Sequence, residues 1–191
     1  MASLIFGDYS PSGKLPITFY KTTEELPDFL DYAMKNRTYR YMDNEALYPF
    51  GYGLSYTKFQ YTNLKISKDN LQVGEALRLS AVIKNIGDYE ADETVQIYLK
   101  DIEASVEVAK WQLKGIKILH LKPGQQEEIS FELTPQHMSL IDNEGRRILE
   151  PGVFEVFVGG SQPDKRSYKL TGSEVLKGKF EVSGESIELE Y

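Results

Sequence analysis

The chain has 191 residues, and its 22 basic and 29 acidic side chains give a net charge of −7. A hydrophobic content of 41% and an aromatic content of 12% exclude a wholly disordered chain, and the acidic balance argues against binding to nucleic acid or to an anionic membrane. The absence of cysteine excludes disulfides, thiolate catalysis and cysteine-ligated zinc. No apolar run approaches the ~20 residues of a membrane-spanning helix, and residues 1–20 lack the apolar core of a signal peptide. We therefore expect a soluble protein, with no compartment assigned.

The first part of the chain is rich in aromatic residues but poor in regular patterns. Leu4–Phe6 followed by Gly7 predicts the end of a strand and a turn, and residues 15–19 predict a second short extended piece. Thr23 is placed to cap a helix over residues 24–32, which Pro27 would limit to one or two turns. Two strands without partner elements cannot bury a core. Residues 1–35 are therefore expected to be the remnant of a larger domain.

Residues 36–58 form an aromatic-rich linker. Its candidate interface residues are Tyr39, Tyr41, Tyr48, Phe50, Tyr52 and Tyr56. Exposed aromatic faces with polar edges could stack on sugar rings. However, Pro49, Gly51 and Gly53 interrupt the run, whereas a flat binding platform is more typical of regular strands. We therefore predict that these six side chains form a domain interface rather than a sugar-binding surface.

Residues 59–191 have the pattern of an all-β domain. Apolar side chains alternate with polar ones in four stripes, at residues 77–83, 95–99, 129–133 and 154–158, and Phe180 with Val182 could close the set. Turn signals separate the stripes at residues 85–88, 122–124, 142–145 and 150–152. Roughly seven short strands at this spacing predict a mainly β fold, an immunoglobulin-like antiparallel sandwich of two sheets.

Two further segments of this domain carry local predictions. Residues 113–121 are apolar, but their alternation slips at Ile118-Leu119, which indicates either a bulge or a strand buried on both sides. Residues 134–138 resemble a single helical turn that leaves a strand, with Pro135 at the first helical position.

No catalytic, metal or cofactor motif emerges from the residues. The 29 acidic side chains lie in no motif, and most alternate with apolar residues as they would on the solvated face of a sheet. His120 and His137 are the only histidines and lack the spacing of a zinc site. Gly51-Tyr52-Gly53 has two glycines of a dinucleotide loop, but Tyr56 replaces the third, so a tight turn is the better interpretation. We expect no metal and no cofactor.

The chain nevertheless resembles a known family. Tyr-Arg-Tyr at residues 39–41 and Leu-Tyr-Pro-Phe-Gly-Tyr-Gly-Leu-Ser-Tyr-Thr-Lys-Phe at residues 47–59 resemble the stretch in glycoside hydrolase family 3, typified by β-glucosidases, that leads out of the α/β sandwich domain. Residues 11–19 look like the closing strand of that domain. Residues 113–124 and 150–161 are similar to the fibronectin type III-like domain of the family. The resemblance covers nearly the whole chain and implies a C-terminal fragment.

The resemblance also implies which functional parts are absent. In this family the nucleophilic aspartate sits in an N-terminal barrel, commonly before a tryptophan, and the acid/base glutamate usually comes from the α/β sandwich domain, upstream of the residues present here. Trp111 is the only tryptophan and follows Lys110, so it does not match the nucleophile motif. No catalytic residue is carried over, and we expect the isolated chain to be inactive.

The expected role is that of a non-catalytic accessory domain whose partners are the catalytic domains of a parent enzyme. That parent would hydrolyse terminal β-glycosidic bonds by a retaining mechanism with two carboxylates. Truncation would expose an apolar surface, so we predict that the chain self-associates, or that residues 1–20 are disordered or packed in a non-native way. The alternative is a carbohydrate-binding module that brings β-glucoside or polysaccharide to the catalytic site. Its candidate aromatic residues are Tyr89, Tyr98, Trp111, Phe157 and Tyr168.

Overall fold

The computed structural model describes residues 2–190. Its strands are β1 (Phe59–Ile66), β2 (Asn70–Gln72), β3 (Leu77–Asn85), β4 (Ala91–Asp101), β5 (Gln112–Leu121), β6 (Gln126–Leu133), β7 (Leu140–Ile141), β8 (Arg147–Leu149), β9 (Gly152–Gly159), β10 (Leu176–Ser183) and β11 (Ile187–Glu188). Its helices are α1 (Ala2–Phe6), the 3₁₀ turn η1 (Thr23–Glu25), α2 (Thr38–Tyr41), α3 (Pro135–Met138) and α4 (Lys165–Thr171). None of these helices is long and apolar enough to cross a membrane.

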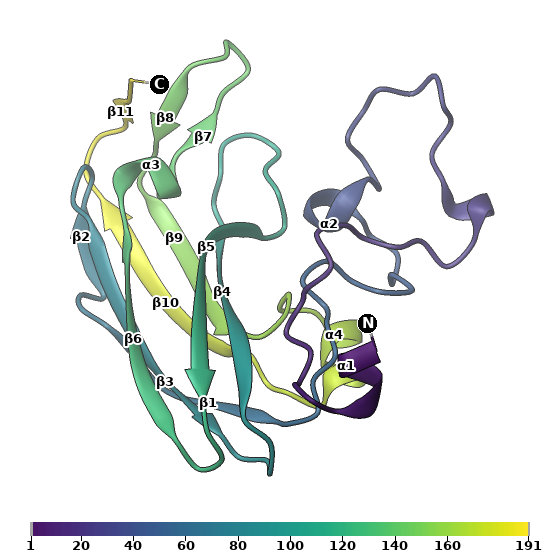
Figure 1. The fold of residues 1–191 in the computed structure, drawn as a ribbon. Helices are drawn as coiled ribbons and strands as arrows, with labels where there is room; N and C mark the ends of the chain where they lie inside the picture. Colours follow the sequence, from purple (N-terminus) through teal and green to yellow (C-terminus); the bar gives the residue numbers. More distant parts are fainter. Residues whose placement is uncertain (1, 191) are drawn as a thin grey trace.

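The strands form a sandwich of two sheets, as predicted (Figure 1). One sheet has the order β1-β3-β6, the other has the order β2-β10-β9-β4-β5, and β11, β8 and β7 make a small third sheet. The expected antiparallel sandwich is confirmed, with one parallel pair among the described strands, β2 with β10. The structure has more strands than the roughly seven expected. The four strands beyond the expected set have two or three residues each, too short to show an alternating pattern.

The core lies between the two main sheets and follows the predicted stripes. On β3, Leu77, Leu79, Ala81 and Ile83 are buried, while the residues between them are exposed or half-buried. Phe154 on β9 and Phe180 on β10 stack with ring centroids 5.5 Å apart. The period-two alternation therefore identified the faces of these strands correctly.

A buried side-chain amide, that of Asn85, makes four hydrogen bonds at the end of β3. Asn85 is fully buried, and its Nδ2 donates to the carbonyls of Tyr89 (2.8 Å) and Leu121 (2.9 Å). Its Oδ1 accepts from Thr57 Oγ1 (2.6 Å) and from the backbone N–H of Gly87 (3.1 Å). One side chain thus joins the approach to β1, the turn between β3 and β4, and the end of β5.

The edge strand β5 was expected either to carry a bulge at Ile118-Leu119 or to be buried on both sides, and the structure excludes the second alternative. Its Ile116 and Ile118 side chains are 58% and 66% exposed, whereas Leu119 and Leu121 are buried, so the strand is not buried on both sides. A bulge is present, but it lies earlier in the strand: the register with β4 shifts so that Gly115 opposes Ile97 and Leu113 opposes Tyr98. The apparent slip at Ile118-Leu119 therefore reflects apolar side chains on the outer face of an edge strand.

The single turn predicted after β6 is confirmed as α3. Pro135 is its first residue, and Thr134 caps it, with the backbone N–H of Thr134 donating in return to His137 Nδ1 (3.0 Å). Because that nitrogen accepts a hydrogen bond, the imidazole is held in its neutral form. Burial, followed by the charge of Lys114, lowers the pKa of His137, which also favours the neutral form.

Two predictions near the N-terminus were wrong. Ala2–Phe6 is a helical turn rather than a strand end, because its backbone bonds are local: the N–H of Gly7 donates to the carbonyl of Leu4 (3.2 Å). Gly7 has a φ of +80°, a left-handed conformation that ends a helix readily. The expected helix over residues 24–32 is only the turn η1, preceded by Thr22 rather than capped by Thr23. Leu26 is extended because it precedes Pro27, which stops the turn.

Candidate domain interface

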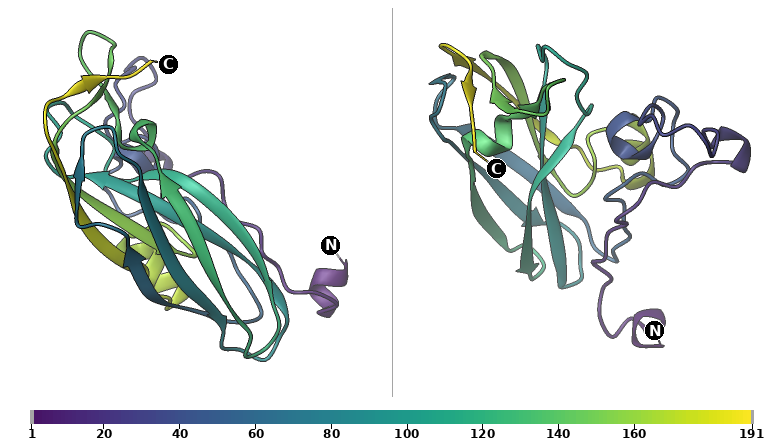
Figure 2. Two further views of the ribbon diagram at one scale, coloured as in Figure 1. Left: turned by 90° about the vertical axis from the view of Figure 1, so that its left-hand side faces the viewer. Right: turned by 90° about the horizontal axis from the view of Figure 1, so that it is seen from above.

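The N-terminal segment, defined here as residues 2–58, lies outside the sandwich beside β4 and α4 (Figures 1 and 2). On β4, Val95, Ile97 and Leu99 point into the core. Gln96 and Tyr98 point to the opposite face, yet they are only 2% and 0% exposed. Since strand residues alternate between faces, both faces of this strand are covered, the outer one by the N-terminal segment.

Gln96 fixes the centre of this contact. Its Nε2 donates to the carbonyls of Gly51 (2.9 Å) and Gly160 (3.0 Å), and its Oε1 accepts from the Tyr98 hydroxyl (2.6 Å). Gly51 has a φ of +76°, and a Cβ at this position would lie 2.2 Å from Gln96 Oε1. The turn at residues 51–53 therefore needs its first glycine both for backbone conformation and for close approach to β4.

An aromatic cluster holds the neighbouring part of the segment. Tyr39 stacks on Phe50 with centroids 4.2 Å apart, and its ring meets Tyr98 edge-to-face at 6.1 Å. The backbone N–H of Leu113 donates to the Tyr39 hydroxyl (3.1 Å). Burial raises the pKa of Tyr98 far above its usual value, so its hydroxyl stays protonated and keeps donating to Gln96.

The other predicted interface residues do not join this cluster. Tyr48 stacks on Tyr52 at 5.6 Å and meets Phe19 edge-to-face at 6.2 Å, and it remains 41% exposed. Tyr56 is 48% exposed and donates to the carbonyl of Leu4 (2.7 Å). Tyr41 is half-buried in α2, with its carbonyl accepting from the N–H of Asn36 (3.3 Å). The six side chains thus form two stacked pairs, one of which packs on β4, with Tyr41 and Tyr56 outside both pairs.

Residues 15–19 were expected to be one extended piece, but they bend at residues 16–17 and run beside residues 47–52. Four backbone hydrogen bonds of 2.8–2.9 Å join them, including Leu15 N–H to the Tyr52 carbonyl and Phe19 N–H to the Tyr48 carbonyl. Only the Phe19–Tyr48 pair forms a regular antiparallel bridge. This irregular ladder lets two distant parts of the segment dock on β4 as one unit.

Charged side chains of the sandwich reinforce the edge of the contact. Lys110 donates to the Met42 carbonyl (2.8 Å) and pairs with Asp43, and its own N–H donates to the carbonyl of Arg40 (2.8 Å). On α4, Arg166 donates to the carbonyl of Leu47 (3.1 Å). Backbone carbonyls of the segment are thus satisfied by cations of the sandwich.

Glu45 should titrate at unusually low pH. Its carboxylate accepts hydrogen bonds from Lys169 of α4 (2.9 Å) and from Lys21 (3.1 Å). These two bonds lower the pKa of Glu45 from 4.5 to about 2, and the bond from Lys169 has the larger effect. Since the folded-state pKa is depressed, this link contributes above pH 4.5 and is lost as the pH falls through about 2. We expect carbon-detected NMR to show that midpoint, and Lys169→Ala to raise it toward 4.5. Lys165→Ala on the same helix is the control, and an equal rise in both variants would contradict the assignment.

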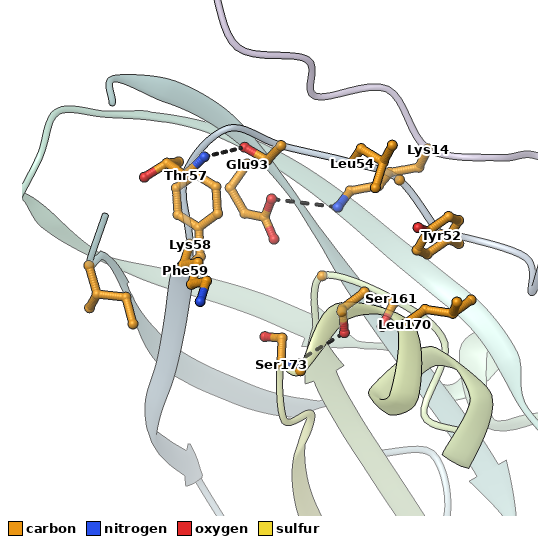
Figure 3. A pocket seen from close by; sticks show the side chains of 16 residues that line it. Lys14, Tyr52, Leu54, Thr57, Lys58, Phe59, Glu93, Ser161, Leu170 and Ser173 are labelled. Atoms are coloured by element: carbon orange, nitrogen blue, oxygen red, sulfur yellow. Dashed lines mark hydrogen bonds and ion pairs between the residues drawn. The ribbon is translucent and has the colours of Figure 1, made fainter. Parts of the chain in front are cut away.

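A cavity of about 280 Å³ lies where the segment meets the start of β1 and the end of α4 (Figure 3). Glu93 of β4 points into it and is 5% exposed. Its Oε1 accepts from the Tyr61 hydroxyl, and Lys14 Nζ lies 3.6 Å from its Oε2. Burial, together with the adjacent carboxylate, raises the pKa of Tyr61 well above its usual value. Glu93 therefore ties Lys14 of the segment to the sandwich.

Sequence reasoning missed the sandwich half of this contact. Gln96 and Tyr98 follow the alternation of a solvated sheet face, and Lys110 and Arg166 look like ordinary surface cations. Glu93 also fits a solvated face. The covering segment buries Gln96 and Tyr98 and gives Lys110 and Arg166 their backbone partners, and the local pattern of a strand carries no information about what covers its outer face.

Two family models match this chain. The fibronectin type III-like domain matches residues 93–162, and the glycosyl hydrolase family 3 C-terminal domain matches residues 1–56. The two matches thus fall on the sandwich and on the N-terminal segment.

Relatives align across both parts. A xylan 1,4-beta-xylosidase from Xylanibacter ruminicola is 38% identical over 90% of this chain and 20% of its own length. A periplasmic beta-glucosidase from Salmonella typhimurium is 34% identical over 95% of this chain and 24% of its own length. The structure of beta-glucosidase 3B from Thermotoga neapolitana, in complex with alpha-D-glucose, matches with a TM-score of 0.83 at 32% identity, over 100% of this chain and 27% of that one. The chain thus spans about a quarter or less of the length of these relatives. It belongs to glycoside hydrolase family 3, as a C-terminal fragment that contains a fibronectin type III-like domain.

Proposed function

We propose that this fragment is a non-catalytic accessory part of a family 3 glycoside hydrolase and stabilises the catalytic domains of its parent. In this proposal residues 1–35 are the remnant of the α/β sandwich domain, residues 36–58 are the linker, and residues 59–191 are the fibronectin type III-like sandwich. The aromatic residues of the interface are Tyr39, Tyr41, Tyr48, Phe50, Tyr52 and Tyr56.

The names of the relatives support a parent that acts on β-glycosides. Those named above are a β-xylosidase and two β-glucosidases. The parent is accordingly proposed to hydrolyse terminal β-glycosidic bonds by the retaining mechanism with two carboxylates.

One observation supports the accessory role. The N-terminal segment packs on β4 with one side and exposes large apolar side chains on another. Gln96 and Tyr98 are buried beneath it, whereas Phe29, Leu30 and Tyr32 are 91%, 75% and 88% exposed. Soluble domains rarely expose a run of large apolar side chains without a partner. A neighbouring domain of the parent chain is the partner that this surface fits.

A polysaccharide platform on the sandwich has little support. Of its candidate aromatic residues, Tyr98 is fully buried and Phe157 is 8% exposed. Tyr89 and Tyr168 are exposed, but they lie in the turn after β3 and in α4, not along one strand. These residues therefore do not present a row of ring faces to a polysaccharide chain.

The accessory role predicts that the isolated chain self-associates through its N-terminal segment. Sedimentation velocity should show an average mass that rises with protein concentration, and the double change Phe29→Ser with Leu30→Ser should weaken this association at least tenfold. Ile118→Ser is the matched control, because it removes an apolar side chain that is 66% exposed on the sandwich. A monomer at every concentration, or equal effects of the two changes, would count against the proposal.

The same preparation tests the absence of catalysis. With 4-nitrophenyl β-D-glucoside and β-D-xyloside, the purified chain should show no release of nitrophenol above the buffer rate. Turnover that copurifies with the chain and is proportional to its concentration would overturn the non-catalytic role.

A further inference from the structure

The loop between η1 and α2 turns its large apolar side chains to the outside. Phe29, Leu30 and Tyr32 are 91%, 75% and 88% exposed, and Leu26 and Met34 are exposed beside them. Figures 1 and 2 show this loop projecting away from the sandwich. Exposed loop tips are usually polar and mobile, whereas this one is apolar and is fixed by hydrogen bonds of its own.

Arg37 holds the loop from within. Its guanidinium donates to the carbonyls of Asp28, Asp31 and Ala33 over 2.5–3.1 Å. Its backbone N–H donates to the carbonyl of Met34 (3.0 Å). Arginine presents its donors in a rigid planar fork, which a lysine ammonium does not reproduce. One side chain thus fixes backbone groups along the whole tip of the loop.

Two aspartates add local turns at the same tip. Asp28 Oδ1 accepts from the N–H of Leu30 (2.8 Å), and Asp31 Oδ1 accepts from the N–H of Ala33 (2.9 Å). Bonds of this kind hold a turn without help from neighbouring elements. Phe29 lies between the two aspartates, so the backbone that carries its exposed ring is fixed.

The backbone on either side of Arg37 is strained. Asn36 has a φ of +58° and Thr38 a φ of +55°. A left-handed conformation is uncommon for residues other than glycine, and for a β-branched residue such as threonine it is an outlier. Strain of this kind persists only where the surrounding structure enforces it, and it concentrates at functional sites. Here the two strained residues flank the one side chain that holds the loop.

The charge of the loop indicates the chemistry of its partner. Residues 23–34 contain four acidic side chains and no basic one. An apolar pocket with lysine or arginine side chains at its rim would complement both the exposed rings and this charge. The relatives named above extend well beyond the part that aligns with this chain, which is 20–27% of their length. In the proposed parent, the catalytic domains are therefore the source of such a pocket.

We propose that residues 26–34 are a preorganised anchor that inserts Phe29, Leu30 and Tyr32 into an apolar pocket with a basic rim on a catalytic domain of the parent. Arg37 is its positioning residue. The proposal rests on the accessory role and adds the side chains that bind, the residue that holds them and the chemistry of the partner surface. An anchor that is fixed before binding loses little conformational entropy on association, and buried apolar anchors supply most of the energy of an interface.

Amide hydrogen exchange tests the preorganisation in the isolated chain, well below the concentration at which it associates. The N–H groups of Leu30 and Ala33 should exchange about tenfold or more slower than in an unstructured peptide. Arg37→Lys should remove this protection while that of β3 stays unchanged, because the ammonium keeps the charge but not the fork. Arg40→Lys, at an exposed position of α2, is the matched control. Unprotected N–H groups in the unaltered chain, or equal effects of the two variants, would overturn the role of Arg37.

Thiol labelling tests the insertion in the full-length parent. The chain has no cysteine, so Phe29→Cys adds a single thiol to it. Maleimide should label this position about tenfold or more slower in the parent than in the dilute isolated chain, with peptide mass spectrometry to assign the label. Asn143→Cys, at an exposed turn position of the sandwich, is the control and should react equally in both. Adding Arg37→Lys should restore most of the reactivity of position 29 in the parent.

Equal labelling of position 29 in the parent and in the isolated chain would overturn the insertion. Tyr32→Cys keeps Phe29 and Leu30 in place and provides the same comparison if the change at position 29 itself weakens docking. Labelling in the parent that does not rise in about 1 M salt would contradict the basic rim. These outcomes are distinct from failure of the accessory role, which is measured by self-association and turnover of the isolated chain without the parent.

Discussion

Asn85→Ala should lower the free energy of unfolding of the sandwich by about 3 kcal/mol, since each buried partner left unpaired costs roughly 1–3 kcal/mol. The change removes four hydrogen bonds, to Thr57, Gly87, Tyr89 and Leu121. The partners stay buried where the turns and strand ends hold them, so the loss is not recovered by water. With a urea dependence of about 1–3 kcal/mol per molar, the unfolding midpoint should fall by at least ~1 M.

Asn143→Ala is the matched control for this loss. Asn143 is exposed in the turn between β7 and β8, where replacement should change stability by no more than about 0.5 kcal/mol. A loss of unfolding free energy for Asn85→Ala as small as that of Asn143→Ala would contradict the structural role of the buried amide. Asn85→Asp should lose at least as much stability as Asn85→Ala, because it places a carboxyl oxygen against the carbonyls of Tyr89 and Leu121 in a fully buried site.

The sandwich could be predicted from the sequence because its longer strands show an alternation of apolar and polar residues. The stripes on β3, β6 and β9 record which face is buried, and turn residues such as those at 122–124 mark where the chain reverses. Short strands such as β2 and β7 could not be found, since two or three residues have no measurable period. Their pairing is decided by the neighbouring strands rather than by their own residues.

The contact between the N-terminal segment and β4 could not be predicted from local sequence patterns, for a different reason. Burial of Gln96 and Tyr98 depends on residues 45 or more positions away, including the carbonyl of Gly51. The amide of Asn85 and the carboxylate of Glu93 fit turn and surface positions equally well when only their neighbours are considered. The prediction of an interface in residues 36–58 rested on aromatic content, which indicates that such residues pack but not against which strand.

Gly51→Ala should release the N-terminal segment while the sandwich stays folded. The left-handed backbone at this position disfavours alanine by about 1–2 kcal/mol. The added Cβ would lie 2.2 Å from Gln96 Oε1 and 2.9 Å from the Tyr98 hydroxyl, both of which are buried. Either Gln96 moves and loses its bonds to Gly51 and Gly160, or the segment lifts away from β4. The two effects together weaken docking by about 3 kcal/mol, or roughly a hundredfold.

Amide hydrogen exchange locates the effect. The N–H groups of Leu15 and Gly51, which bond across the ladder, should lose about a hundredfold of protection, while those of β3 and β9 should keep theirs. Gly7→Ala is the matched control, because Gly7 has a similar φ of +80° in the same segment but has no atom within 4 Å of the added Cβ. Equal losses in the two variants would show that backbone strain alone loosens the segment, and loss throughout the sandwich would show that the two parts fold as one unit. Retained protection at Leu15 and Gly51 would mean that close contact with Gln96 does not hold the segment in place.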